Sequence, residues 1–213
     1  MKQHWKKIIG IGVLSLGVLC SCAAQPAEQP QQQEAQEPAS AEQWAAWLPE
    51  GVIVKLAERE PNQGVQEALI QYYEIPEDSW KDTRYYYNYV DFDGDGTEEI
   101  FTVALGAYTS GSGGSSALWL DSADFSVKQA FTLVNTPIIV TAEPVQDGLA
   151  LILQRDGGGA AMEFVQLTCT DGVYTNVADA APLADISAVT GTAILANDLI
   201  ADLEQGTYLT LAD

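Results

Sequence analysis

Residues 85–105 read YYYNYV, then DFDGDGTEE, then IFTVAL. The outer parts are rich in the aromatic and β-branched residues that strands favour, while the middle part is acidic and contains two glycines. Aspartate and glycine form tight turns because they tolerate backbone conformations that other residues avoid. The segment therefore predicts two strands, near residues 85–90 and 99–105, joined by a short turn.

Similar runs follow along the chain, separated by Gly, Asp and Asn. Further strands are expected near residues 117–120, 127–133, 138–141, 149–154 and 162–168. The short turns QDG at 146–148 and TDG at 170–172 favour antiparallel hairpins. Most of the strands should therefore lie in an antiparallel sheet.

Apolar residues at helical spacing flank these strands on both sides. The expected helices are 41–48, 65–73 and 197–204, the last capped by Asn197 or Asp198. The predicted fold class is α+β, an antiparallel β-sheet of hairpins packed with N-terminal helices and a C-terminal helix.

The acidic turn at 91–99 has the pattern of a cation site. Carboxylates stand at positions 1, 3, 5 and 9, glycine stands at position 6, and position 7 can offer its backbone carbonyl. Oxygen ligands without nitrogen or sulfur select calcium over transition metals, and magnesium fits less well because it demands strict octahedral geometry. The alternative is a solvated turn that binds nothing, but five acidic residues within nine repel one another unless a cation neutralises them.

This turn is unlike an EF-hand loop, because it joins strands and has Thr102 at position 12. It resembles the calcium loops of FG-GAP and related VCBS-type repeats. The resemblance implies side-chain ligands at Asp91, Asp93, Asp95 and Glu99, and the carbonyl of Thr97. Those families repeat the motif around a propeller, whereas this chain carries one copy, so a propeller is not implied.

The N-terminus has the layout of a signal peptide. Residues 2–7 are basic, and an uncharged apolar run at 8–19 follows, too short to span a bilayer. The next residues, LCSC at 19–22, resemble the lipobox of bacterial lipoproteins, with cleavage before Cys22 and lipid on its sulfur. Two acyl chains hold a protein on a membrane where one is marginal. The chain is therefore predicted to be anchored in the cell membrane, on its extracytoplasmic face.

Composition divides the rest of the chain into two parts. Residues 22–42 consist mainly of Gln, Pro, Glu and Ala, which cannot offset the entropy of ordering, and predict a disordered tether. Residues 43–213 have the length of one domain. The expected organisation is a signal peptide at 1–21, the tether and a single globular domain.

Cleavage before Cys22 also changes the chemistry that remains. It removes three of the nine Lys and Arg residues and the only histidine, but none of the 30 acidic residues, so the net charge becomes 6 minus 30, or −24. Such a charge disfavours nucleic acid and anionic lipid surfaces as partners. Cys169 remains as the one unmodified thiol, predicted to be a buried small hydrophobe. Without histidine there is no Ser-His or Cys-His pair and no His-containing zinc site.

Two glycine-rich segments, 111–114 and 157–159, carry no phosphate-loop signature. They are expected to be hairpin connections, or else places where a ligand approaches the backbone. Trp119, Tyr108 and the tyrosines at 85–87 are interpreted as core residues, with an aromatic binding platform as the alternative. Residues 85–90, 109–114 and 191–194 also look like those of a group of uncharacterised lipoproteins of Gram-positive anaerobes, a resemblance that implies compartment and domain count but no activity.

Three functions are compatible with these features. The favoured one is a noncatalytic, calcium-stabilised module on the cell surface that binds a protein or a cell-wall ligand. The second is a hydrolase working with two carboxylates, as glycosidases do, because acidic residues are the abundant acid-base groups. The third is an accessory sensor or inhibitor of a membrane complex.

Overall fold

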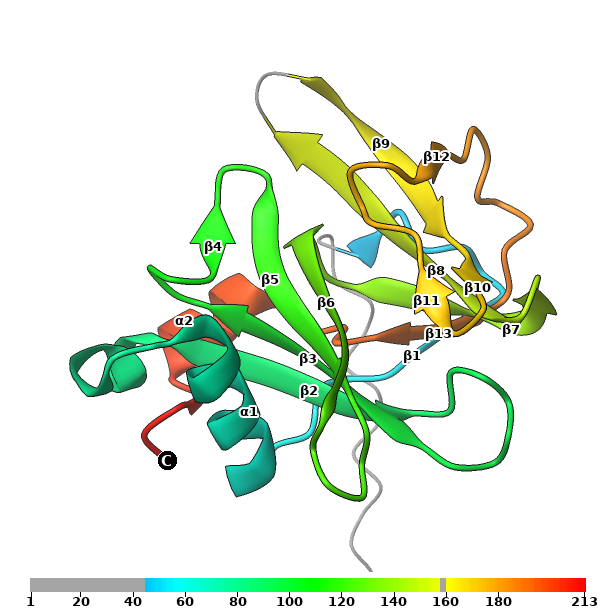
Figure 1. Ribbon diagram of the computed structural model, residues 1–213. Coiled ribbons are helices and arrows are strands. Elements are labelled where there is room, and N and C mark those ends of the chain that lie inside the picture. The colour runs from blue at the N-terminus through cyan, green and yellow to red at the C-terminus, as the bar shows by residue number, and fades with distance from the viewer. Residues whose placement is uncertain (1–44, 158–159) are drawn as a thin grey trace, which may run out of the picture. The chain divides into compact units, whose positions relative to one another are not determined.

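The computed structural model describes residues 45–157 and 160–213 (Figure 1). The predicted signal peptide, Cys22, the tether and the first residues of the helix expected at 41–48 lie outside the described residues. Gly158 and Gly159 of the second glycine-rich segment do so as well.

The first sheet is built on the hairpin predicted from residues 85–105. Its strands follow the order β14-β2-β3-β5-β4, and β6 also pairs with β5. Their bounds are β2 Arg84–Val90, β3 Glu99–Leu105, β4 Ser110–Gly111, β5 Gly114–Leu120, β6 Val127–Val134 and β14 Leu209–Thr210. β2 and β3 pair antiparallel, with Arg84 opposite Leu105 and Val90 opposite Glu99. The acidic turn therefore closes this hairpin at one end, and Arg84 lies at the other.

The second sheet has the order β1-β13-β7-β8-β9-β12. Its strands are β1 Val52–Val54, β7 Ile138–Val145, β8 Gly148–Gly157, β9 Ala160–Leu167, β12 Ala181–Pro182 and β13 Gly191–Ile194. All pairs are antiparallel except β1 with β13. The predicted turns at 146–148 and 170–172 join β7 to β8 and β10 (Cys169–Thr170) to β11 (Val173–Tyr174).

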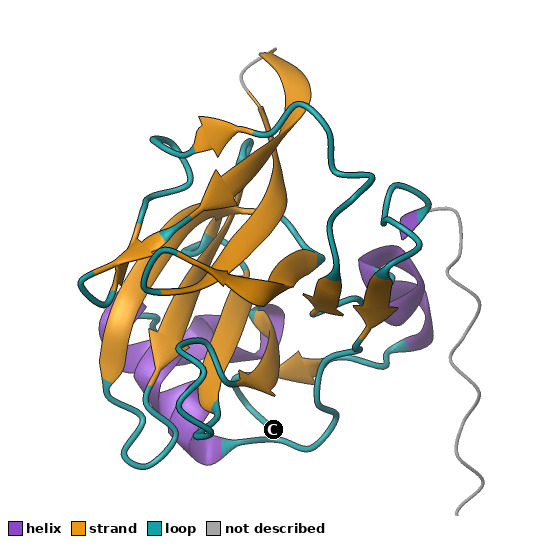
Figure 2. Cartoon of the chain, turned by 90° about the vertical axis from the view of Figure 1, so that its right-hand side faces the viewer, coloured by secondary structure: helices purple, strands orange, loops and turns teal. Residues whose placement is uncertain are grey.

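The helices are short and lie at the periphery of the β-sheets (Figure 2). They are α1 at Gln63–Tyr73, a 3₁₀ helix, η2, at Glu77–Asp82, and α2 at Leu199–Gln205. α1 begins two residues earlier than expected, because the side chain of Asn62 accepts a hydrogen bond from the amide of Val65. For α2 the cap is Asp198, which accepts from two amides of the first turn.

Side chains point alternately to the two faces of each strand, and the buried apolar ones form three clusters. Phe101, Val103 and Trp119 of the first sheet pack against residues of the second sheet such as Leu151 and Leu153. The opposite face of the first sheet is covered by α1, and the opposite face of the second by residues 47–48 and 183–189. Because β3, β5 and β8 are apolar on both faces, each needs a covering layer on either side.

The α+β class is confirmed, with strands predominating. The expected antiparallel strands divide into two six-stranded sheets that cover each other and a separate two-stranded pair, β10 and β11. Residues 45–48 form a turn rather than the end of the expected helix, and Pro49 disfavours the helical conformation at the residue before it. Trp119 and the tyrosines at 85–87 are buried, as core residues should be, whereas Tyr108 is 53% exposed.

Asn88 ties the two sheets together through the backbone. It lies on β2 with no exposed surface. Its amide nitrogen donates to the carbonyl of Leu56 at 2.9 Å, and its side-chain oxygen accepts from the amide of Leu195 at 2.8 Å. Two segments far from β2 in sequence therefore have backbone polar groups satisfied by one buried side chain.

Replacing Asn88 with alanine should lower the free energy of unfolding by about 1–3 kcal/mol, because it leaves the buried amide of Leu195 and the partly buried carbonyl of Leu56 without their partner. Urea denaturation would measure the change. Asn176→Ala is the matched control, since Asn176 is exposed and bonds only Asp179, at 3.4 Å. Equal stability of the two variants would contradict this role of Asn88.

Candidate metal centre

The turn between β2 and β3 is shaped by its own first carboxylate. Asp91 accepts hydrogen bonds from the amides of Gly94 at 2.7 Å and Gly96 at 3.0 Å. Both glycines have positive φ, 78° and 89°, which L side chains rarely adopt. The space around them is open, so it is the backbone conformation that requires glycine. The aspartate-glycine alternation therefore specifies the turn locally.

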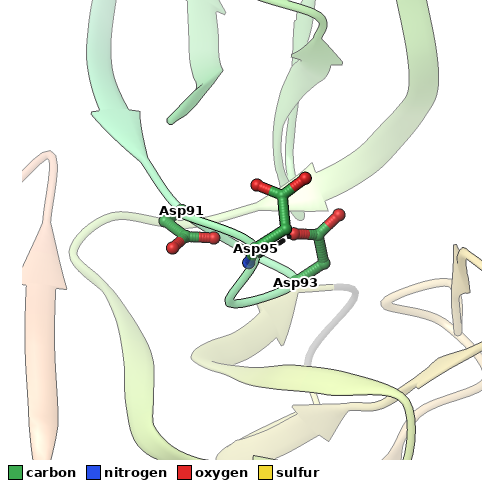
Figure 3. A group of neighbouring side chains, drawn as sticks. All are labelled: Asp91, Asp93 and Asp95. Carbon is green, nitrogen blue, oxygen red and sulfur yellow. Dashed lines mark hydrogen bonds between the residues drawn. The ribbon is translucent and has the colours of Figure 1, made fainter. Parts of the chain in front are cut away.

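Asp91, Asp93 and Asp95 are brought together by this turn (Figure 3). Each offers one carboxylate oxygen, and these oxygens lie within 4.8 Å of one another. Oxygens that bind one calcium ion at 2.3–2.6 Å lie up to about 5 Å apart, so the spacing fits a shared cation. Asp93 and Asp95 also accept hydrogen bonds from the amides of Asp95 and Thr97, but carboxylate oxygens keep further lone pairs for an ion.

Phe92 lies between two of these aspartates and faces the opposite way. It is 1% exposed, and its ring packs 5.6 Å from that of Trp119 and 5.9 Å from that of Phe101. Its carbonyl accepts a hydrogen bond from the amide of Leu149, on β8 of the second sheet. The aspartates of the turn therefore face the candidate ion site, while Phe92 between them faces the core.

Glu99, the fourth predicted carboxylate ligand, is engaged elsewhere. It is 4% exposed, and its Oε2 accepts from the amide of Phe92 at 3.1 Å. Its Oε1 lies 2.7 Å from Nζ of Lys128 on β6. Thr97, expected to offer its carbonyl, is exposed on the turn. The structure thus brings three of the predicted ligands together and pairs Glu99 with a lysine.

Lys128 is a component of this region that the sequence did not reveal. Its ammonium also lies 4.0 Å from Asp121 and 5.1 Å from the centre of the Trp119 ring. Partial burial lowers the pKa of Lys128, but the hydrogen bond and charge of Glu99, with smaller effects of Asp121 and Asp93, outweigh it and raise the pKa overall. The lysine is a fixed positive charge beside the acidic turn. A single lysine in a strand carries no sequence signal for this role.

The thiol of Cys169 lies in the core beneath the turn region. It is 5% exposed and belongs to the cluster between the sheets. Burial raises the pKa of Cys169, and nearby Asp147 and Asp93 raise it further, against a backbone hydrogen bond that lowers it. A buried thiol with a raised pKa is a poor nucleophile.

Comparisons with protein-family models, with curated proteins and with solved structures find no match to this chain. Within the described residues, no helix is long and apolar enough to cross a membrane.

Replacing Lys128 with methionine should have opposite effects on stability and on calcium binding. In chelator, unfolding should cost about 1–3 kcal/mol less, because the buried carboxylate of Glu99 loses its counter-charge while the partial exposure of Lys128 limits the loss. Calcium should bind severalfold more tightly, since a nearby positive charge is gone and Glu99 is released.

Calcium titrations followed by thermal melting would measure both effects. Lys81→Met removes an exposed lysine from η2 and should change neither quantity. If Lys128→Met bound calcium no more tightly than the parent protein, competition by the lysine would be ruled out.

Proposed function

We propose that the chain is a lipoprotein anchored through Cys22 on the extracytoplasmic face of the cell membrane, whose domain is a noncatalytic binding module stabilised by calcium. The observation that carries the calcium part is the convergence of Asp91, Asp93 and Asp95 within 4.8 Å. The donor set fits a hard cation, because it consists of oxygen alone.

Calcium would hold the three carboxylates of the acidic turn together by binding all of them, a role that we call a staple. Three carboxylates at this spacing repel one another by about 1 kcal/mol per pair even in bulk water, and a divalent cation removes that cost. Because Phe92 connects the turn to the core and to β8, ordering the turn also stabilises the contact between the sheets. Extracellular modules bind calcium at roughly 10⁻⁴ to 10⁻³ M, so the staple would form after export.

Asp91, Asp93 and Asp95 are the proposed direct ligands. The resemblance to FG-GAP loops adds the carbonyl of Thr97 and the carboxylate of Glu99. Glu99 would join the ion only by releasing Lys128, which holds it at 2.7 Å. The two cations therefore compete for one carboxylate.

The anchor is supported by the residues of the N-terminus. The basic start, the apolar run and the lipobox at 19–22 precede a tether of polar composition. The partner would be a protein or a cell-wall ligand, because the strongly negative domain repels nucleic acid.

The two alternatives gain no specific support from the described residues. A glycosidase needs a general acid kept in a desolvated place, whereas Asp82 and Asp156, which line the pocket of about 570 Å³ beside Arg84, are both exposed. An accessory sensor or inhibitor would use the same anchor and requires a partner that no contact identifies. The binding module is therefore the function we put forward.

Calcium at about ten to a hundred times its Kd should stabilise the protein by about 1.4–2.7 kcal/mol, raising Tm by about 3–10 °C. Asp93→Asn keeps an oxygen that can accept the amide of Asp95 but removes one charge, so most of that shift should vanish. Glu143→Gln, which neutralises an exposed carboxylate on β7, should keep the full shift. Identical melting of the parent protein in calcium and in chelator would refute the staple.

Cys22→Ala should move the protein from the membrane fraction to the soluble fraction and abolish labelling by radioactive fatty acid. Cys20→Ala is the matched control and should leave both unchanged, because Cys20 lacks the lipobox spacing. Fractionation followed by immunoblotting measures the distribution. Membrane association that survives Cys22→Ala would disprove this anchor.

A further inference from the structure

A second polar site lies at the end of the β2–β3 hairpin opposite the acidic turn. A pocket of about 570 Å³ opens there, between Arg84 of β2, the glycine-rich turn joining β4 and β5, and residues 134–136 after β6. Figure 1 shows β4 and the acidic turn on opposite sides of the hairpin. The glycine-rich segment expected to be either a connection or a ligand contact thus lines a cavity.

Arg84 is the only cationic side chain among the residues that line this pocket. Within the described part of the chain it makes no ion pair and no side-chain hydrogen bond, and its Nη1 is buried without a partner. The guanidinium lies 5.6 Å from the centre of the Tyr208 ring. A buried donor on a charged group is costly unless something satisfies it.

The surroundings of Arg84 do not supply that partner. Burial raises the pKa of Tyr86 to about 12, the charge of Asp202 adds to the rise, and the charge and side chain of Arg84 oppose it, so the guanidinium and the phenol are in contact. That contact does not reach the geometry of a hydrogen bond, and the Tyr86 hydroxyl and the Nη1 of Arg84 both stay buried without a partner. Both oxygens of Asp202 accept hydrogen bonds from Asn197 and Thr207.

Three other cations of the described residues have partners, whereas Arg59 and Lys81 are exposed to solvent. Lys128 binds Glu99, and Arg155 binds Glu163 together with three backbone carbonyls. Lys55 donates to the carbonyl of Tyr89. Arg84 pairs with neither of the two carboxylates that line its pocket, Asp82 and Asp156, so its guanidinium remains able to bind an anion.

The opposite wall of the pocket adds polar groups on a fixed frame. Thr136 lines it with a buried hydroxyl that has no partner. The amide of Asn135 lies 3.3 Å from the carbonyls of Gly113 and Gln154, which ties the glycine-rich turn to β8. A Cβ at Gly114 would lie 2.7 Å from the backbone of Leu133, so this turn packs closely on β6. The cavity is therefore built by contacts between both sheets.

The rest of the lining selects among anions. Val103, Leu105 and Leu199 provide an apolar floor, which suits a short hydrophobic group next to the charge. Asp82 and Asp156, at the exposed rim, repel a dianion such as phosphate more strongly than a monoanion, and they can accept hydrogen bonds from amide N–H groups. One arginine matches one carboxylate through two parallel hydrogen bonds.

We propose that this pocket binds the carboxylate end of a short peptide with an apolar last residue, anchored by Arg84. The site gives the binding module of the proposed function its ligand class and rests on that function, but it shares no residue with the calcium turn. It would give the unpaired guanidinium of Arg84 a counter-charge, and it would account for the glycines that leave the β4–β5 turn without side chains.

The test is a titration of the ¹⁵N-labelled mature protein in detergent, in calcium, with N-acetyl-leucine and with its neutral amide. The acid should move the amide resonances of Gly111, Gly114 and Ser115, with a Kd in the millimolar range expected for so small a ligand. The amide should bind at least tenfold more weakly. Arg84→Gln should weaken binding of the acid at least tenfold, Arg84→Lys should restore part of it, and the exposed-cation control Lys81→Gln should have no effect.

Equal binding of acid and amide by the parent protein would overturn the proposal, and that comparison requires no variant to fold. Unchanged binding by folded Arg84→Gln, or tighter binding of inorganic phosphate than of the acid, would also overturn it. Calcium binding is measured in the same spectra from the amide resonances of Gly94 and Gly96. A protein that does not bind calcium can therefore be distinguished from one whose pocket does not bind the acid.

Discussion

The burial of Phe92 is the interaction on which the domain's arrangement depends. Its ring fills the space between the sheets beside Phe101, Trp119 and Tyr174, its carbonyl holds β8 through the amide of Leu149, and its amide donates to Glu99. Burying an aromatic side chain of this size contributes about 2–3 kcal/mol. One residue of an exposed turn thereby fixes the closed end of the central hairpin against the second sheet.

This burial also determines which side of the turn is available for chemistry. Successive residues of an extended chain face opposite ways, so placing Phe92 inward directs Asp91 and Asp93 outward. The amides of Gly94 and Gly96 then bond to Asp91, which preorganises the acidic turn before any ion arrives. Lys128 supplies the positive charge that the buried Glu99 needs in the absence of an ion. Stability without an ion and the proposed capacity to bind calcium therefore come from neighbouring charges.

The hairpin and its turn were predictable because their determinants are local. Aromatic and β-branched runs, Asp-Gly spacing and a carboxylate at alternate positions are all read from adjacent residues. Strands of two to four residues such as β1, β12 and β14 form only because a longer strand offers its edge, which no local pattern records. Lys128 and Arg84 gain their roles from strands distant in sequence, so their place near Glu99 and near the glycine-rich turn required the fold.

The β2–β3 hairpin has the acidic turn at one end and Arg84 at the other, and the strands between them limit what one end can transmit to the other. A ligand shifts an equilibrium only between states for which its affinity differs. Tyr86, Phe101 and Val103 are buried between the sheets, and Tyr85, Ile100 and Ala104 are buried under α1, so the hairpin is packed on both faces. Such a close-packed element has one arrangement rather than two. Calcium at the acidic turn should therefore act on the unfolding equilibrium of the whole domain, and leave the intrinsic affinity at Arg84 unchanged wherever the domain is folded.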